Sequence, residues 1–234
     1  MPSDAEVAEH RAIQAAAKAV LSSLAFEITA ADTEQSIAAK AYRGLCERGY
    51  PDTWYYDCPA YVLLGSRSCV SMSGREYQPA TEPVGDTNLI TVDLSPMQAG
   101  RWGDCARSFF VEHGVVAHEP CAPEFANGKA FIESLHHEMA SFVQPQTTFH
   151  QLFEWANARI AAAGFVNLDF AHNVGHSLAH RREDRIYVKA GNHAKLSDVA
   201  FFTFEPHVRV ADGAWGFKHE NVYFFSTAGV LQEL

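Results

Sequence analysis

Five residues of the kind that bind metal ions lie at the edges of strand-like segments in this sequence. They are four carboxylates and one imidazole: Asp93, Asp104, His176, Glu205 and Glu220. Carboxylates gathered in a core repel one another unless a group of opposite charge lies among them. A pair of divalent cations removes that cost and also supplies chemistry. The residue types and their order therefore predict a two-metal site.

Each of these residues has a simpler interpretation when it is taken alone. Asp93 and Asp104 are typical of exposed carboxylates that flank the turn of a hairpin. The metal interpretation is favoured because three more ligand-type residues follow them in order. Glu205 is the most informative of these. It ends the run 201–204 of apolar and β-branched residues, where an unpaired buried charge is costly.

The composition is that of an ordinary globular protein with an acidic balance. Hydrophobic residues make up 47% of the 234 residues, which suits a single domain over 1–234. The formal net charge of −10 argues against nucleic acid as a partner, because phosphate binding needs clusters of Lys and Arg. No apolar run reaches the roughly 20 residues that span a bilayer, and no signal peptide is evident. Five cysteines without paired spacing are expected to be reduced thiols, so we expect a cytoplasmic protein without a membrane partner.

The hydrophobic pattern predicts an α+β fold with the order helix, helix, strands, helix, helix, strands. Helices are predicted over 4–25, about 32–48, 124–143 and 148–163. Strands are predicted over 61–65, 88–94, 105–112, 185–190, 200–206, 207–211 and 217–226, with a loop over 66–87. Pairing of 88–94 with 105–112 brings Asp93 close to Asp104, as a shared metal pair requires. The order also indicates two similar halves of about 110 residues each.

Five short segments together carry a resemblance to a known family. They are Val92-Asp93-Leu94 with Gly103-Asp104-Cys105-Ala106-Arg107-Ser108-Phe109, then Gly175-His176, Phe204-Glu205-Pro206 and His219-Glu220-Asn221. In order and spacing they resemble the M24 metallopeptidases, the group of methionine aminopeptidase, aminopeptidase P and prolidase. The setting of Asp104 and the Glu205-Pro206 step are more similar to the prolidase and aminopeptidase P branch. The resemblance implies a pita-bread fold, in which two pseudo-symmetric αβ halves form a curved antiparallel sheet covered by helices.

The resemblance also implies roles for the five residues. Asp93 would chelate one ion, Asp104 and Glu220 would bridge two ions, and His176 and Glu205 would complete the other. Oxygen ligands with one imidazole suit Mn²⁺, Fe²⁺, Co²⁺ or Zn²⁺. Two such ions hold a bridging water and polarise a carbonyl, and Glu205 would relay a proton during hydrolysis of an amide. The implied protein is a hydrolase for a small peptide or amide-containing metabolite, and a homodimer is expected from the family.

Two departures from the family pattern concern histidines around the metal ions. The loop before Asp93, over 73–79, has no histidine where the family usually has one. A second family histidine, seven positions after the Gly-His, is replaced by Glu183. Candidate replacements in catalysis are His172, His180 and His207. A structural role is about as well supported for His172.

These departures leave two other functions and two local roles open. A lyase, cyclase or other small-metabolite enzyme would keep the metals without the missing histidines, and a non-catalytic binding protein is a further alternative. Trp54, Tyr55 and Tyr56 either form an aromatic wall over the site or pack in the core. Arg75 and Tyr77 either contact the substrate or belong to a solvated loop.

Overall fold

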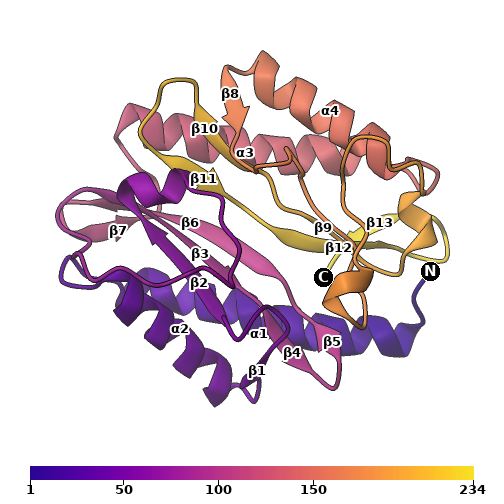
Figure 1. The fold of residues 1–234 in the computed structure, drawn as a ribbon, viewed down its shortest axis with the longest axis horizontal. Helices are drawn as coiled ribbons and strands as arrows, with labels where there is room; N and C mark the ends of the chain where they lie inside the picture. Colours follow the sequence, from indigo (N-terminus) through magenta and orange to yellow (C-terminus); the bar gives the residue numbers. More distant parts are fainter.

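The computed structural model describes residues 1–234, and the chain folds into two halves of the same construction (Figure 1). In each half, two helices cover the outer face of antiparallel strands, and the strands of the two halves meet in the middle of the molecule. The predicted α+β pita-bread arrangement is confirmed. None of the helices is long and apolar enough to cross a membrane.

The first half contains two helices and two sheets. The helices are α1 (Asp4–Glu27) and α2 (Glu34–Glu47). The main sheet has the order β2-β3-β6-β7, with β2 (Ala60–Leu64), β3 (Asn88–Leu94), β6 (Cys105–Glu112) and β7 (Val115–Ala117). A small sheet of β1 (Asp52–Thr53), β4 (Pro96–Gln98) and β5 (Arg101–Trp102) extends it.

The second half repeats the plan with shorter strands. Its helices are α3 (Pro123–Phe142) and α4 (Phe149–Ala162). One sheet has the order β11-β10-β8, with β8 (Phe165–Asn167), β10 (His207–Val210) and β11 (Gly216–Lys218). The other has the order β13-β12-β9, with β9 (Phe202–Phe204), β12 (Asn221–Phe225) and β13 (Leu231–Glu233). Single-turn 3₁₀ helices lie at Gly65–Cys69, Arg182–Asp184 and Leu196–Asp198.

Local sequence signals explain where three of the four helices begin. Ser3, Thr33 and Thr148 each form a capping box with the residue three positions later, which satisfies free N–H groups of the first turn. The fourth helix, α3, begins with Pro123, whose fixed φ suits the first helical position. The predicted helices are therefore confirmed with boundaries that differ by one or two residues.

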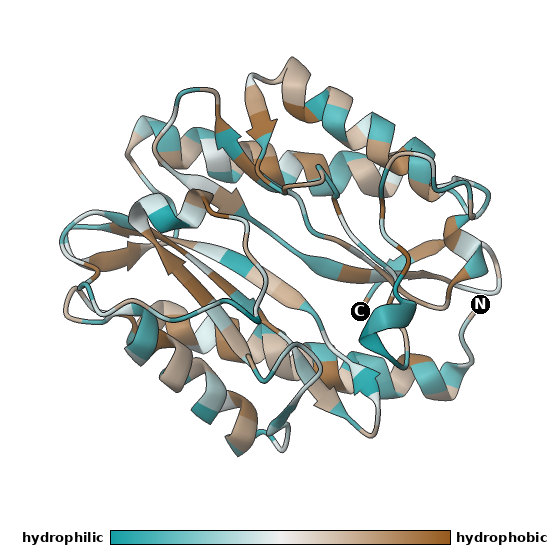
Figure 2. Ribbon diagram, in the orientation of Figure 1, coloured by the Kyte–Doolittle hydropathy of each residue, from teal (hydrophilic) through white to brown (hydrophobic).

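Each half has its own hydrophobic core between helices and strands. The first core joins α1 and α2 to β2, β3 and β6, and the second joins α3 and α4 to β8 to β12. Figure 2 shows the strands β2 and β3 as mainly hydrophobic, whereas both characters alternate along the helices. The predicted pairing of 88–94 with 105–112 is confirmed, and Asp93 lies opposite Ala106 in the register. Cys105 points into the first core, as expected from strand alternation.

Two predicted strands are wrong in the second half. No strand forms over 185–190, where Tyr187 makes only an isolated bridge with His176. The segment instead directs Arg185, Tyr187 and Lys189 toward a cavity, so its alternation reflects a cavity wall rather than a sheet face. The predicted strand 217–226 is divided into β11 and β12, because the chain passes from one sheet to the other at 219–220.

Asp32, just before α2, is the centre of a hydrogen-bond network that should contribute to stability. Its carboxylate accepts hydrogen bonds from the Thr29 N–H (2.8 Å) and hydroxyl (3.0 Å), the Ser36 hydroxyl (2.7 Å) and the Lys40 ammonium (2.7 Å). Burial raises the pKa of Asp32, but these donors outweigh burial and lower the pKa to about 2. The charged carboxylate therefore stabilises the folded state.

We expect Asp32→Asn to lower the free energy of unfolding at pH 7 by about 2 kcal/mol. The folded pKa lies below the unfolded value of about 3.9, so the contribution is complete above about pH 4 and is lost as the pH falls toward 2. Urea unfolding of both proteins between pH 7 and pH 3 measures this. The exposed Asp86→Asn is the matched control. A difference between wild type and Asp32→Asn that does not shrink below pH 4 contradicts the assignment.

Candidate metal centre

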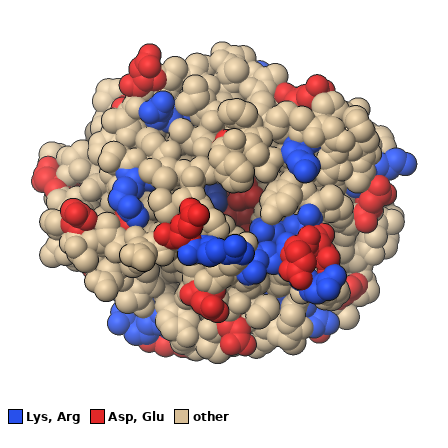
Figure 3. Space-filling view, in the orientation of Figure 1, with Lys and Arg blue, Asp and Glu red and all other residues tan.

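The five predicted ligands meet where the two halves join, beside a cavity of about 500 Å³. Asp93 and Asp104 come from the first half, and His176, Glu205 and Glu220 come from the second. All except Glu220 line the cavity, and Glu220 is fully buried next to Asp104 and His176. Figure 3 shows this face hollowed near its centre, with acidic side chains deep inside and basic side chains at the rim. The fold thus brings together residues that are up to 127 positions apart.

Helix α1 fixes Asp104 through a buried glutamine. The Gln14 amide donates to the Asp104 carbonyl at 2.7 Å and accepts from the Asp104 N–H at 3.0 Å. The Trp54 indole N–H donates to the carbonyl of the preceding residue, Gly103, at 3.0 Å. Because Gln14 is completely buried, its two hydrogen bonds leave no amide group unsatisfied in the core. The backbone of Asp104, which directly precedes β6, is therefore fixed in position.

A glycine and a threonine place His176. Gly175 has φ of 153°, and a Cβ at this position would lie 2.2 Å from the Thr203 carbonyl oxygen, so only glycine fits. The Thr203 hydroxyl accepts a hydrogen bond from the His176 N–H at 3.0 Å. His176 Nδ1 lies 3.0 Å from the Ser177 carbonyl oxygen and donates its proton there. In the neutral ring, Nε2 therefore carries no proton, and its electron pair is free to bind a metal ion. This nitrogen faces Asp104.

An arginine holds the backbone of Glu220, while the Glu220 carboxylate has no hydrogen-bond partner. Arg107 donates from Nη1 to the Glu220 carbonyl and from Nη2 to the Asn221 side chain, both at 2.7 Å. Ala106 and Glu220 also form a β-bridge that joins the two halves. Both carboxylate oxygens of Glu220 are buried and have no hydrogen-bond partner. Buried carboxylate oxygens without donors are rare because they lose hydration without compensation.

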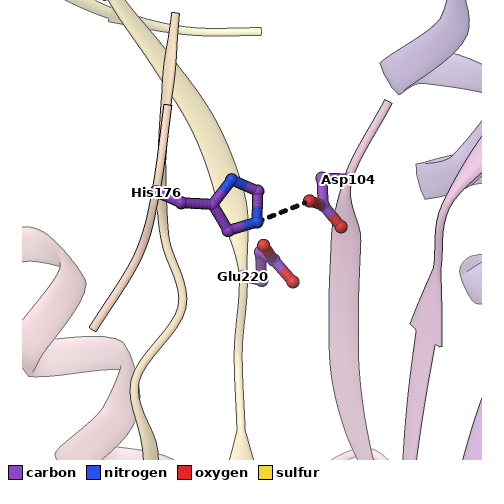
Figure 4. Close-up of side chains that lie close together, drawn as sticks. All are labelled: Asp104, His176 and Glu220. Carbon is purple, nitrogen blue, oxygen red and sulfur yellow. Dashed lines mark ion pairs between the residues drawn. The ribbon is translucent and has the colours of Figure 1, made fainter. Parts of the chain in front are cut away.

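Asp104, His176 and Glu220 point toward one another (Figure 4). One possible ligand atom from each lies within 4.8 Å of the others, and His176 Nε2 is 3.3 Å from Asp104 Oδ2. Glu205 is near, with Oε1 at 3.7 Å from the same His176 nitrogen. Asp93 lies apart from this group and forms an ion pair of 2.5 Å with Lys218.

The pKa shifts of the carboxylates indicate that the cluster lacks positive charge. Burial, supported by the charge of Asp93, raises the pKa of Asp104 to about 6, although the hydrogen bond with His176 opposes it. Burial and the charges of Asp104 and Glu205 raise the pKa of Glu220 well above its ordinary value. Burial raises the pKa of Glu205, but the positive charges of Lys218, His176 and Arg185 together outweigh burial and lower it. Asp104 and Glu220 are thus held in a place that disfavours their charged forms.

The residues present fit a divalent metal ion. A dication between Asp104, His176 and Glu220 gives a partner to both Glu220 oxygens and to the free His176 nitrogen. Three side-chain ligands from two carboxylates and one imidazole, open to a cavity, suit a catalytic centre of Mn²⁺, Fe²⁺, Co²⁺ or Zn²⁺. The orphaned Glu220 oxygens carry this assignment.

The structure separates the three candidate catalytic histidines. His207 lines the cavity, and its Nε2 lies 2.6 Å from the Ser68 carbonyl oxygen. Burial lowers the pKa of His207 to about 4, so the ring is neutral near pH 7. His172 and His180 are exposed and do not line the cavity. Only His207 is therefore placed to meet a bound molecule, and a catalytic role for any of the three stays a prediction.

The walls of the cavity are aromatic and basic. Trp54, Tyr55 and Tyr56 do form a wall, and Trp54 contacts the His176 ring edge-on with centroids 5.7 Å apart. Arg75 and Tyr77 do not line the cavity. Sequence reasoning did not single out Arg185, Tyr187 and Lys218. Lys218 carried a usable signal, because it precedes the ligand Glu220 by two positions and alternation places such residues on one face.

We expect Glu220→Gln to separate stability from metal binding. In the presence of a chelator, the variant should be as stable as wild type or more stable by up to roughly 3 kcal/mol, because a neutral amide replaces a buried carboxylate that has no hydrogen-bond donor. With Mn²⁺ at a hundred times its dissociation constant, wild type should gain about 2.7 kcal/mol and the variant much less. Urea unfolding with and without MnCl₂ measures both effects, and the exposed Glu119→Gln serves as control. Equal gains from Mn²⁺ in wild type and Glu220→Gln contradict the assignment.

Solved structures with the same fold cover nearly the whole chain. The X-Pro aminopeptidase from Thermotoga maritima superposes with a TM-score of 0.81 at 16% identity, over 99% of this chain and 61% of that chain. The prolidase from Pyrococcus furiosus gives 0.81 at 15% identity, over 100% and 64%. The dipeptidase from Mycobacterium ulcerans gives 0.78 at 20% identity, over 99% and 58%. This chain therefore spans about three fifths of the length of these proteins.

The sequence itself decides the family. Among curated proteins, none matches the chain. The family model described as "Metallopeptidase family M24" matches residues 8–226, which include all five ligand-type residues of the centre. The resemblance seen in the sequence is confirmed, and the chain belongs to metallopeptidase family M24.

Proposed function

We propose that this chain is a metal-dependent hydrolase that cleaves an amide or peptide bond in a small substrate of the Xaa-Pro type. The observation that carries the proposal is the buried Glu220 carboxylate, whose two oxygens accept no hydrogen bond, beside Asp104 and His176 at a cavity of substrate size. Membership of family M24 supports hydrolysis, and the shared fold with an X-Pro aminopeptidase and prolidases supports the Xaa-Pro class. A bound divalent ion supplies Lewis acidity, which lowers the pKa of water and polarises a carbonyl.

Glu205 is the residue best placed to move a proton. It lines the cavity within 3.7 Å of His176, and its lowered pKa keeps it in the charged form that accepts a proton. A carboxylate in this position takes a proton from the attacking water and passes it to the leaving amine. Trp54 and Tyr55 above the centre limit access of bulk water, which strengthens each electrostatic interaction inside.

Arg185 gives the cavity a binding group for an anionic substrate end. Its guanidinium lies 4.9 Å from the Trp54 ring centre and 5.3 Å from that of Tyr187. These rings hold the guanidinium in place by cation–π contact. Its Nε–H donates to the Arg182 carbonyl at 2.9 Å, and its two terminal nitrogens remain available as donors. A guanidinium binds a carboxylate with two parallel hydrogen bonds. We therefore assign to Arg185 the carboxylate of a short peptide.

One observation favours the alternative of a lyase, cyclase or other small-metabolite enzyme. The only histidines that line the cavity are His176 and His207. The loop 70–73, which lines the same cavity, offers Val, Ser, Met and Ser in place of a histidine. A metal-loaded protein that releases no amine from Xaa-Pro or Met peptides supports this alternative. The two-ion form, manganese as the ion, a homodimer and a cytoplasmic location stay predictions from the sequence.

We expect Asp104→Ala to abolish hydrolysis. Loss of a residue that hydrogen-bonds to a metal ligand typically lowers activity or metal affinity about 10–100-fold. Loss of a ligand itself should therefore lower kcat/KM by more than about 100-fold. Wild type and variant are loaded with Mn²⁺ and assayed with a panel of Xaa-Pro and Met peptides by detection of the free amine. The exposed Asp86→Ala is the control. Full turnover by a folded Asp104→Ala protein would falsify the proposal.

We expect Arg185→Met to weaken binding of peptides that have a free carboxylate. Loss of one hydrogen bond to a charged group costs about 1.5–3 kcal/mol, which corresponds to roughly a 10–100-fold higher KM with little change in kcat. The C-terminal amide of the same peptide is the matched control, since it lacks the charge. Wild type should discriminate between acid and amide, and the variant should not. Equal discrimination by both proteins assigns the carboxylate to another residue.

A further inference from the structure

Lys218 places an ammonium group among the carboxylates of the centre. Its Nζ is 2.5 Å from Asp93 Oδ2, 3.4 Å from Glu205 Oε2 and 3.7 Å from Glu220 Oε2. The backbone behind it is fixed, because the Lys218 N–H donates to the Ser108 hydroxyl at 2.8 Å and the same hydroxyl donates to the Lys218 carbonyl at 3.0 Å. The side chain is mostly buried, with 18% exposed. The ammonium is therefore a built part of the cluster.

The ligand-type residues divide between two positions for positive charge. Asp104, His176 and Glu220 converge on one point and leave both Glu220 oxygens without a hydrogen bond. Asp93 takes no part in that group and has the ammonium as its closest partner. Glu205 lies between, with one oxygen toward His176 and the other toward Lys218. One position is open to an ion, and the other holds a cation supplied by the chain.

We infer that the Lys218 ammonium takes the place of a second divalent ion, so that each chain binds one ion at Asp104, His176 and Glu220. The inference rests on the proposed metal centre and replaces its expected two-ion form. Four carboxylates carry four negative charges, and one divalent ion with one ammonium supplies three positive charges. A second ion bound by Asp93 would have to displace the ammonium or lie next to it. Two positive groups in contact with the same carboxylate repel each other strongly.

Metal content tests this directly. The full chain is stripped with a chelator, loaded with excess MnCl₂, freed of unbound ion by gel filtration and measured by elemental analysis. Wild type should retain one Mn²⁺ per chain, and Lys218→Met should retain two, because methionine keeps the volume and removes the charge. Electron paramagnetic resonance should show isolated Mn²⁺ in wild type and a spin-coupled pair in Lys218→Met.

Three further variants control the result. Lys189→Met makes the same change at another lysine of the cavity and should bind one ion. Asp93→Asn should keep the ion, and Asp104→Asn should lose it. Two ions in wild type, or one ion in a folded Lys218→Met protein, overturn the inference. If Lys218→Met does not fold, Asp93→Asn decides, since loss of its ion overturns the inference. No ion in wild type overturns the proposed metal centre itself.

Discussion

The structure depends on the burial of carboxylates at the joint between its two halves. Asp104 and Glu220 lie almost entirely out of solvent, and neither can be charged there without a positive partner. The backbone around each of these two residues is fixed by neutral contacts or by an arginine that donates to carbonyl oxygens. Gln14 binds the peptide group of Asp104, and Arg107 binds the carbonyl of Glu220. Neither neutralises the carboxylates themselves.

This arrangement ties the centre to the docking of the two halves. Each half has its own core, and a single β-bridge between Ala106 and Glu220 lies directly beside the ligands. An ion bound by Asp104 from one half and His176 and Glu220 from the other therefore joins them. Because binding to the folded state alone stabilises it by mass action, metal occupancy and the relative position of the halves are linked. The ion proposed for the reaction would therefore also stabilise the fold.

The sequence predicted the parts that depend on local pattern and on order along the chain. Capping residues and helical periodicity placed the four helices, and the five ligand-type residues identified the centre before any contact was known. It failed where tertiary context overrides pattern. The segment 185–190 alternates like a strand but lines a cavity, and 217–226 crosses between sheets. The role of Gln14 and the pairing of Lys218 with Asp93 depend on contacts with residues more than 80 positions away, which no local pattern contains.

The ligand-type residues and the cavity walls come from different kinds of structure. Family membership accounts for the ligand-type residues and leaves the walls open. Asp93 lies on β3, and Asp104, Glu205 and Glu220 lie next to the ends of β6, β9 and β12. His176 is followed by Ser177, which bridges to Phe202 of β9. Most of the wall residues come from loops and turns, including 54–58, 70–73, 169–173 and 185–189. Loops can change length and composition without disturbing a register. The binding role proposed for Arg185 therefore depends on a loop, whereas most of the ligand-type residues lie on or next to strands. Lys218 belongs to both, since it lies at the end of a strand and also lines the cavity.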